Sequence, residues 1–167
     1  MKKSGINQVT ACKGQNDEPS VYLLIKCTKT KLSIKAEKLS GVFKKHYVQG
    51  LPFTASFNEF SAPDTGDPHD HPFDFITHIL SGGYTERNYS INELGDVDIN
   101  DIERKPGTSH YVKATDIHQI IDLPTGRCVT LMIPQSGHVK PTYFYRFIDG
   151  KAYRRLWNKR KFLTVES

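Results

Sequence analysis

The sequence predicts an all-β protein, built as a sandwich or a small barrel. Short extended segments recur at intervals of roughly 8–12 residues, separated by polar stretches and by turns rich in Gly and Pro. One stretch has a helical pattern instead, with apolar residues at 39, 42 and 43, which predicts a short helical addition within 36–47. At 37% hydrophobic and 25% charged residues, the 167-residue chain is expected to fold as a single domain, 1–167.

The expected strands follow one another along the chain. A first pair is predicted on either side of the polar link 28–30. The later strands are predicted at 53–60, 74–80, 84–90, 109–114, 117–123, 128–133 and 142–148. The polar, acidic stretch 92–101 is interpreted as a connection, and 123–126 (Leu-Pro-Thr-Gly) as a turn.

Cysteine usage and hydropathy exclude several classes of protein. The three cysteines, Cys12, Cys27 and Cys128, are odd in number and include no Cys-x-x-Cys, so neither a disulfide framework nor a thiolate zinc site is predicted. No segment approaches the ~18 consecutive apolar residues of a membrane span. The basic start lacks an apolar core, so no secretory signal is predicted. We therefore expect a cytoplasmic protein with no membrane partner.

Charge is segregated along the chain. Residues 1–60 carry ten lysines against four acids (+6), 61–125 carry four basic residues against twelve acids (−8), and 126–167 carry nine against two (+7). The acidic third favours holding a cation. The basic, aromatic carboxyl end, 149–167, could bind nucleic acid through stacking and phosphate contacts, but packing of its aromatics against the barrel is the favoured interpretation.

The acidic third contains a pair of histidines, His69 and His71. Side chains two residues apart point to the same face of an extended strand. Two imidazoles on one face provide half of a metal site. The apolar run 75–80 follows, so the pair is expected at the start of a strand within a sheet.

The wider pattern around this pair resembles the two signatures of the cupin superfamily, particularly its small single-domain members. The first signature is matched by His69-x-His71, an apolar strand and Gly82-Gly83-Tyr84-x-Glu86. The second is matched by Lys105-Pro106-Gly107, then Asp116-Ile117-His118 and the strand 128–133. The resemblance covers about 53–148. It implies an antiparallel jelly-roll barrel that binds one divalent metal ion at its mouth.

The resemblance also implies the ligands of that ion. His69 and His71 match the first signature, and His118 is the favoured match in the second, with His110 as its rival. The glutamate usual in the first signature is missing, because its position falls on Phe75. Cupin thiol dioxygenases use three histidines, so this loss does not remove the chemistry.

The role of Asp74 decides between two possible ligand sets for the metal ion. In a regular strand Asp74 would face away from His71, but Pro72 could break that regularity. Asp74 would then join the three histidines as a fourth ligand. Otherwise the site has three histidines alone, and Asp74 is a carboxylate that orients a neighbouring group.

The function expected from this resemblance is a metal-dependent oxidoreductase of the dioxygenase type, acting on a small polar substrate. Fe(II) is the favoured ion, with Zn, Ni or Mn as alternatives. Asp74, Tyr84 and Tyr111 are the candidate catalytic groups. Glu86 and Arg104 are further polar candidates without an assigned role.

Other interpretations stay open. The barrel could be a non-catalytic module that binds a small ligand or a partner. It could also be a sugar-nucleotide epimerase or isomerase, with His71 and Asp74 as the base and Tyr84 or Tyr111 as the acid. His78 either lines the cavity or packs between strands, and packing is favoured. Two copies could form a homodimer through uncovered edge strands.

Overall fold

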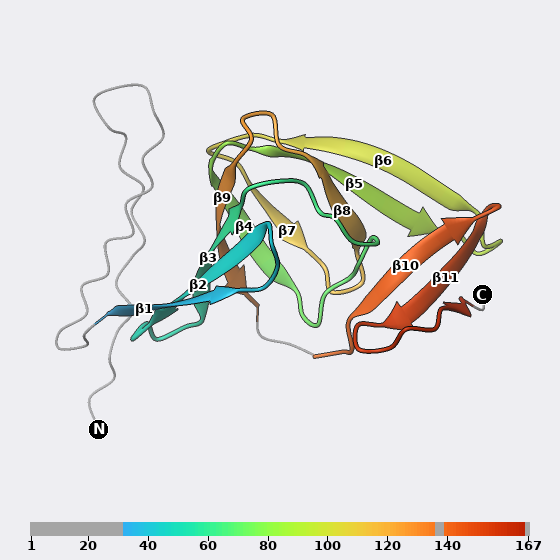
Figure 1. Cartoon of the computed structure of the whole chain (residues 1–167), viewed down its shortest axis with the longest axis horizontal. Helices are drawn as coiled ribbons and strands as arrows, with labels where there is room; N and C mark the ends of the chain where they lie inside the picture. The colour runs from blue at the N-terminus through green and yellow to red at the C-terminus, as the bar shows by residue number, and fades with distance from the viewer. Residues whose placement is uncertain (1–31, 136–138, 166–167) are drawn as a thin grey trace.

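The computed structural model describes residues 32–135 and 139–165, and within these ranges it contains strands and no helix (Figure 1). The strands are β1 (Ser33–Lys38), β2 (Phe43–Gln49), β3 (Ala55–Phe60), β4 (Phe75–Ser81), β5 (Tyr84–Ile91), β6 (Val97–Arg104), β7 (Ser109–Val112), β8 (Ile117–Asp122), β9 (Cys128–Pro134), β10 (Tyr143–Ile148), β11 (Lys151–Leu156) and β12 (Leu163–Thr164). No membrane-crossing helix is found in the described part of the chain. The strand predicted before the 28–30 link lies outside the described residues.

The strands form antiparallel sheets that curve around a common interior (Figure 1). One sheet has six strands in the order β1-β2-β3-β9-β4-β7. Two three-stranded sheets have the orders β6-β5-β8 and β10-β11-β12. His69 lies between these two, because it forms isolated antiparallel bridges to His118 of β8 and to Phe144 of β10. The three-stranded sheets therefore make one layer with His69 at the seam.

The topology is that of an antiparallel jelly roll, which confirms the predicted fold class. Eight consecutive segments make the core: β3, the segment at His69, and β4 to β9. The first sheet contains β3-β9-β4-β7, and the facing layer contains the His69 segment, β8, β5 and β6 in that order. This interleaving of segments is the double Greek key of a jelly roll.

The helix predicted within 36–47 is wrong, because this region forms parts of β1 and β2. The two strands pair in continuous register from Ser33↔Gln49 to Lys38↔Lys44, and β2 also pairs with β3. The apolar spacing that resembles a helix is local. The ladder of hydrogen bonds to β3, which is distant in sequence, overrides it.

The acidic connection predicted at 92–101 is also corrected. Its second half begins β6, which pairs with β5 from Tyr84↔Arg104 to Ile91↔Val97. β6 is an edge strand and is largely exposed, so its residues are polar and lack the apolar alternation of an inner strand.

Apolar side chains fill one part of the space between the layers. Ile79, Tyr84, Ile120, Leu123 and Cys128 form a buried cluster, and Phe75, Val112 and Met132 form a second. The β4–β5 turn beside the first cluster requires glycine at Gly82. Its φ is 81°, and an added Cβ would lie 1.8 Å from the carbonyl oxygen of Arg127.

Two arginines of the basic carboxyl end lie over aromatic rings of the neighbouring strand β10. The Arg155 guanidinium lies 4.6 Å from the ring centroid of Phe144, and that of Arg154 lies 4.8 Å from the centroid of Tyr143. Cation–π contacts of this kind hold both groups within β10 and β11. Nucleic-acid binding by this end stays a prediction.

Candidate metal centre

The main chain places two of the candidate ligands directly opposite each other. The N–H of His69 donates to the carbonyl of His118, and the N–H of His118 donates to the carbonyl of His69, each at 2.9 Å. Residues paired in this way on antiparallel segments project their side chains from the same face of the sheet. The two imidazoles therefore share one face, although 49 positions separate the residues in sequence.

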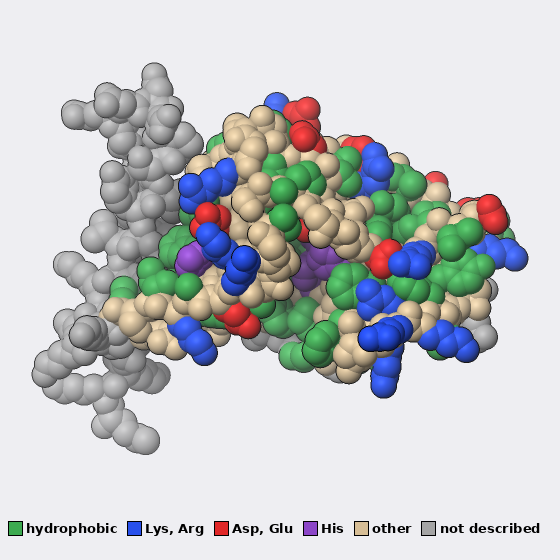
Figure 2. Space-filling view, in the orientation of Figure 1, with side chains coloured by type: hydrophobic (Ala, Val, Ile, Leu, Met, Phe, Trp, Pro, Cys, Tyr) green, Lys and Arg blue, Asp and Glu red, His purple; other side chains and the backbone are tan. Residues whose placement is uncertain are grey.

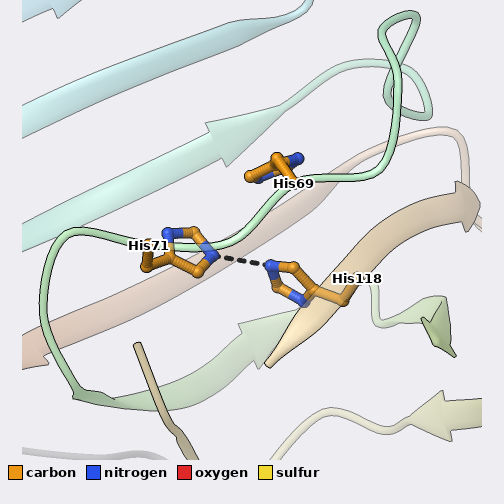
Figure 3. A group of neighbouring side chains, drawn as sticks. All are labelled: His69, His71 and His118. Carbon is orange, nitrogen blue, oxygen red and sulfur yellow. Dashed lines mark hydrogen bonds between the residues drawn. The ribbon is translucent and has the colours of Figure 1, made fainter. Parts of the chain in front are cut away.

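His71 completes a group of three imidazoles (Figure 3). One nitrogen from each of His69, His71 and His118 lies within 4.8 Å of the other two. The Nε2 atoms of His71 and His118 are 2.6 Å apart. Three imidazole nitrogens converging on one space make a donor set suited to a divalent transition metal. The group is the candidate metal centre.

The first two histidines are held in their neutral form. Burial, reinforced by the charge of His118, lowers the pKa of His69 to about 4. Burial and the neighbouring histidines lower the pKa of His71 well below its usual range. A metal ion binds the neutral imidazole, because the coordinating nitrogen must have a free lone pair. These two ligands therefore suit a metal ion without a proton having to leave them near neutral pH.

Glu86 fixes the third histidine from behind. Its Oε1 accepts a hydrogen bond from Nδ1 of His118, and its Oε2 accepts one from Nε of Arg104 at 2.8 Å. Glu86 is only 1% exposed. Burial alone would raise its pKa, but the hydrogen bonds and charges of His118 and Arg104 outweigh burial and lower the pKa to about 2. The carboxylate thus keeps the proton on Nδ1 and leaves Nε2 for an ion.

Sequence reasoning named Glu86 and Arg104 but assigned them no role. Their pairing depends on the β5–β6 register, which sets Tyr84 opposite Arg104 and Glu86 opposite Ile102. The available signal was alternation: Glu86 lies two residues after Tyr84 and therefore shares its face of the strand, and both side chains are buried.

Asp74 and Tyr111 lie together, apart from the three histidines. The carboxylate of Asp74 accepts a hydrogen bond from the hydroxyl of Tyr111 at 2.5 Å and one from the N–H of Ala114 at 2.6 Å. These two bonds lower the pKa of Asp74. The N–H of His71 also donates to the carbonyl of Ala114, at 3.2 Å. Asp74 therefore ties the chain after His71 to the β7–β8 turn.

His110 sits behind the site, next to Tyr84. Its Nε2 is 3.5 Å from the hydroxyl of Tyr84 and 4.0 Å from Glu86, and it is not in the group with His69 and His71. Burial lowers the pKa of His110 to about 4 and raises that of Tyr84. Tyr84 thus presents a neutral hydroxyl beside the site. His78 instead contacts Ser109, 2.5 Å away on the neighbouring strand.

A cavity of about 650 Å³ opens beside the three histidines. Figure 2 shows histidine surface recessed near the middle of the hollowed face. The walls come mainly from β2, β3, β4 and β9, and they are rich in aromatic side chains. Phe43, Phe60, Phe73, Phe75 and Tyr84 are among these. The volume and the few polar groups are typical of a pocket for a small molecule.

No protein-family model and no curated protein matches the chain. Solved structures are similar to it at low identity. Hydroxypropylphosphonic acid epoxidase from S. wedmorenis aligns with a TM-score of 0.46 and 10% identity, over 61% of this chain and 55% of that one. KdgF from Halomonas sp. gives 0.42 and 17%, over 61% and 89%. A mutant of oxalate decarboxylase from Bacillus subtilis gives 0.48 and 13%, over 66% and 29%. This chain therefore spans just over half the length of the epoxidase.

Proposed function

We propose that this chain is a metal-dependent oxidoreductase of the cupin type, with dioxygenase chemistry, in which His69, His71 and His118 hold one divalent ion. The observation that carries the proposal is the donor set. Three imidazoles converge at the wall of the cavity, and the nearby carboxylates of Glu86 and Asp74 are each engaged elsewhere. Three ligands from one side leave the cavity side open for other molecules.

Fe(II) is the ion we propose first, because imidazole ligands suit iron and an open coordination face is what oxygen chemistry needs. Zinc, nickel and manganese are the alternatives. An ion held here would supply open coordination positions at which O2 and a substrate can bind together. The protein would supply orientation, through Glu86 on His118, and exclusion of water, through the aromatic walls.

Tyr84 is the polar group best placed to assist a bound substrate. It lines the same cavity as the three histidines, and burial raises its pKa, so its hydroxyl stays protonated. A neutral hydroxyl can donate a hydrogen bond to a substrate oxygen. Asp74 and Tyr111 are less suited to this role, because they bond to each other and do not line the cavity.

The epimerase alternative receives less support from the geometry. It needs His71 and Asp74 to act as a pair, yet the Asp74 oxygens bond to Tyr111 and Ala114. The non-catalytic alternative is an outcome of the experiment below.

The test is elemental analysis of protein purified without chelator, followed by O2-electrode assays with a panel of small metabolites. We expect about one transition-metal ion per chain and O2 uptake with at least one compound. Protein that holds no transition metal, and takes none up from Fe(II), Zn(II), Ni(II) or Mn(II), would contradict the proposal. A metabolite that raises the melting temperature and is recovered chemically unchanged would favour the binding module.

A further inference from the structure

Lys45 introduces a positive charge into the cavity that also contains the histidines. Alternate residues of β2, namely Phe43, Lys45 and Tyr47, line this cavity. The intervening Lys44 is exposed on the other face. The charge of Lys45 is one of the causes that lower the pKa of His71, so the ammonium and the candidate metal centre share one electrostatic environment.

Within the described residues, Lys45 has no ion pair. The other cations near the site are neutralised, since Lys140 lies 2.6 Å from Asp70 and Arg104 lies 2.6 Å from Glu86. Burial lowers the pKa of Lys45 and outweighs the charge of Glu37, opposite it on β1, which raises that pKa, and the two side chains form no ion pair. The Lys45 ammonium instead lies 5.3 Å from the ring centroid of Tyr47. A partly buried lysine without a carboxylate partner is costly unless an anion joins it.

A cross-strand row of polar residues begins at the lysine and continues over the two neighbouring strands. Asn58 lies opposite Lys45 on β3, and Thr130 lies opposite Asn58 on β9. Both are buried and line the cavity. The Ser56 hydroxyl donates to Oδ1 of Asn58 at 3.3 Å, which points the other end of the amide, a donor, away from Ser56. Ammonium and amide therefore form a donor pair in a largely apolar cavity.

Asp64 is a further charged residue that lines the cavity. One of its oxygens accepts a hydrogen bond from the N–H of Ile120 at 2.9 Å, on the β8 side. Burial has the largest effect on the pKa values of His69 and Tyr84, and the charge of Asp64 acts to raise both. Within the described residues Asp64 forms no ion pair with Lys45, so it gives the lysine no direct neutralising contact.

We propose that the substrate of this site is a small monocarboxylate, whose carboxylate binds Lys45 and the amide of Asn58 while its apolar body packs on the aromatic walls. This proposal rests on the proposed function in one respect, namely that the bound carboxylate is called a substrate. One ammonium, without an arginine fork, matches a single negative charge better than a phosphate dianion. The row of donors and the aromatic side chains lie in the same cavity, so both ends of such a molecule have a partner.

The test uses probes matched in size and shape, in which a neutral amide replaces the charged carboxylate: benzoate against benzamide, and hexanoate against hexanamide. Binding is measured by titration calorimetry on the full chain, once in chelator and once loaded with redox-inert Zn(II). We expect each carboxylate to bind at least about tenfold more tightly than its amide, as a charge-assisted contact implies. Lys45→Met should reduce this ratio to near one, and Lys45→Arg should keep it.

Lys44→Met is the matched control, because Lys44 is the neighbouring lysine on the exposed face, and it should keep the wild-type ratio. Lys45→Gln serves if the methionine variant does not give a cooperative melting curve. An unchanged preference in Lys45→Met, no preference in either pair, or tighter Lys45-dependent binding of phenyl phosphate than of benzoate would each overturn the proposal. A Lys45-dependent preference in protein that takes up no metal would support this subsite and reject the proposed function alone.

Discussion

His69 and His118 exchange both of their backbone hydrogen bonds, so the main chain fixes two of the three candidate ligands relative to each other. A site whose ligands are positioned by a sheet loses little conformational entropy when an ion binds. His71 is placed differently, by its bond to Ala114 and by its position two residues after His69. The ligands therefore differ in how firmly the backbone holds them.

Replacing His71 with alanine should remove the metal without unfolding the protein. The substitution keeps the backbone N–H that donates to Ala114 and removes one of three nitrogens. We expect the metal content to fall from about one ion per chain to near zero, measured by mass spectrometry of the elements, with an unchanged circular dichroism spectrum. His46→Ala is the control, since His46 pairs with Glu59 outside the cavity. Equal metal content in both variants would contradict the site.

Replacing Glu86 with glutamine should make stability depend differently on pH. The pKa of Glu86 is lowered from its ordinary 4.5 to about 2, so its carboxylate stabilises the fold above about pH 4.5 and loses that effect as the pH falls toward 2. With chelator present, we expect Glu86→Gln to cost roughly 3 kcal/mol near pH 7. The gap should close in acid, as measured by urea unfolding.

The exposed Glu103 on β6 provides the comparison for this experiment. It pairs with Lys105 at 3.6 Å in solvent, so Glu103→Gln should change stability little at any pH. A Glu86→Gln variant whose deficit stays constant down to pH 2 would show that the carboxylate charge does not stabilise the fold.

Asp74→Ala should lower stability and leave the metal content unchanged. The substitution removes the acceptor of bonds from Tyr111 and Ala114, which fasten the chain after His71 to the β7–β8 turn. We expect a melting temperature lower by several degrees and wild-type metal stoichiometry. Metal loss as complete as in His71→Ala would instead make Asp74 a fourth ligand.

Gly82→Ala should destabilise the fold more than Gly126→Ala. Both glycines have a positive φ, 81° and 71°, so each alanine incurs strain of about 1–2 kcal/mol. At Gly82 the new Cβ would also lie 1.8 Å from the carbonyl of Arg127, whereas at Gly126 it would meet no atom within 4 Å. Equal losses in denaturant unfolding would mean that the β4–β5 turn relaxes freely.

The pair His69 and His71 could be singled out from the sequence because its signal is local: the two residues have the period of a strand. His118 is predicted only through the cupin resemblance, as the favoured match to the histidine of the second signature. Its pairing with His69 requires the jelly-roll connectivity, which only the resemblance supplied. The same connectivity confirms the fold class.

The contacts that support the histidines depend on the register between strands, which the alternation of apolar residues along one strand does not reveal. Arg104 reaches Glu86 because β5 and β6 pair in one particular register, and the polar residues of the edge strand β6 lack the apolar alternation by which a strand is identified. Asp74 bonds to Tyr111 because β4, which begins at the next residue, pairs with β7 in a register that sets Ile76 opposite Tyr111. A strand period predicts neither contact.

The segment at His69 couples metal binding to the stability of the layer formed by the two three-stranded sheets. The segment around His69 is hydrogen-bonded to β8 on one side and to β10 on the other. The carboxylate of Asp70 accepts one hydrogen bond from the backbone N–H of Tyr143 and another from the hydroxyl of Tyr145. A ligand stabilises only the conformations that can bind it. Binding of a metal ion to the three histidines should therefore slow amide hydrogen exchange in β10 and β11, although these strands contribute no ligand. Equal exchange rates with and without metal would show that the carboxyl-terminal sheet is an independent unit.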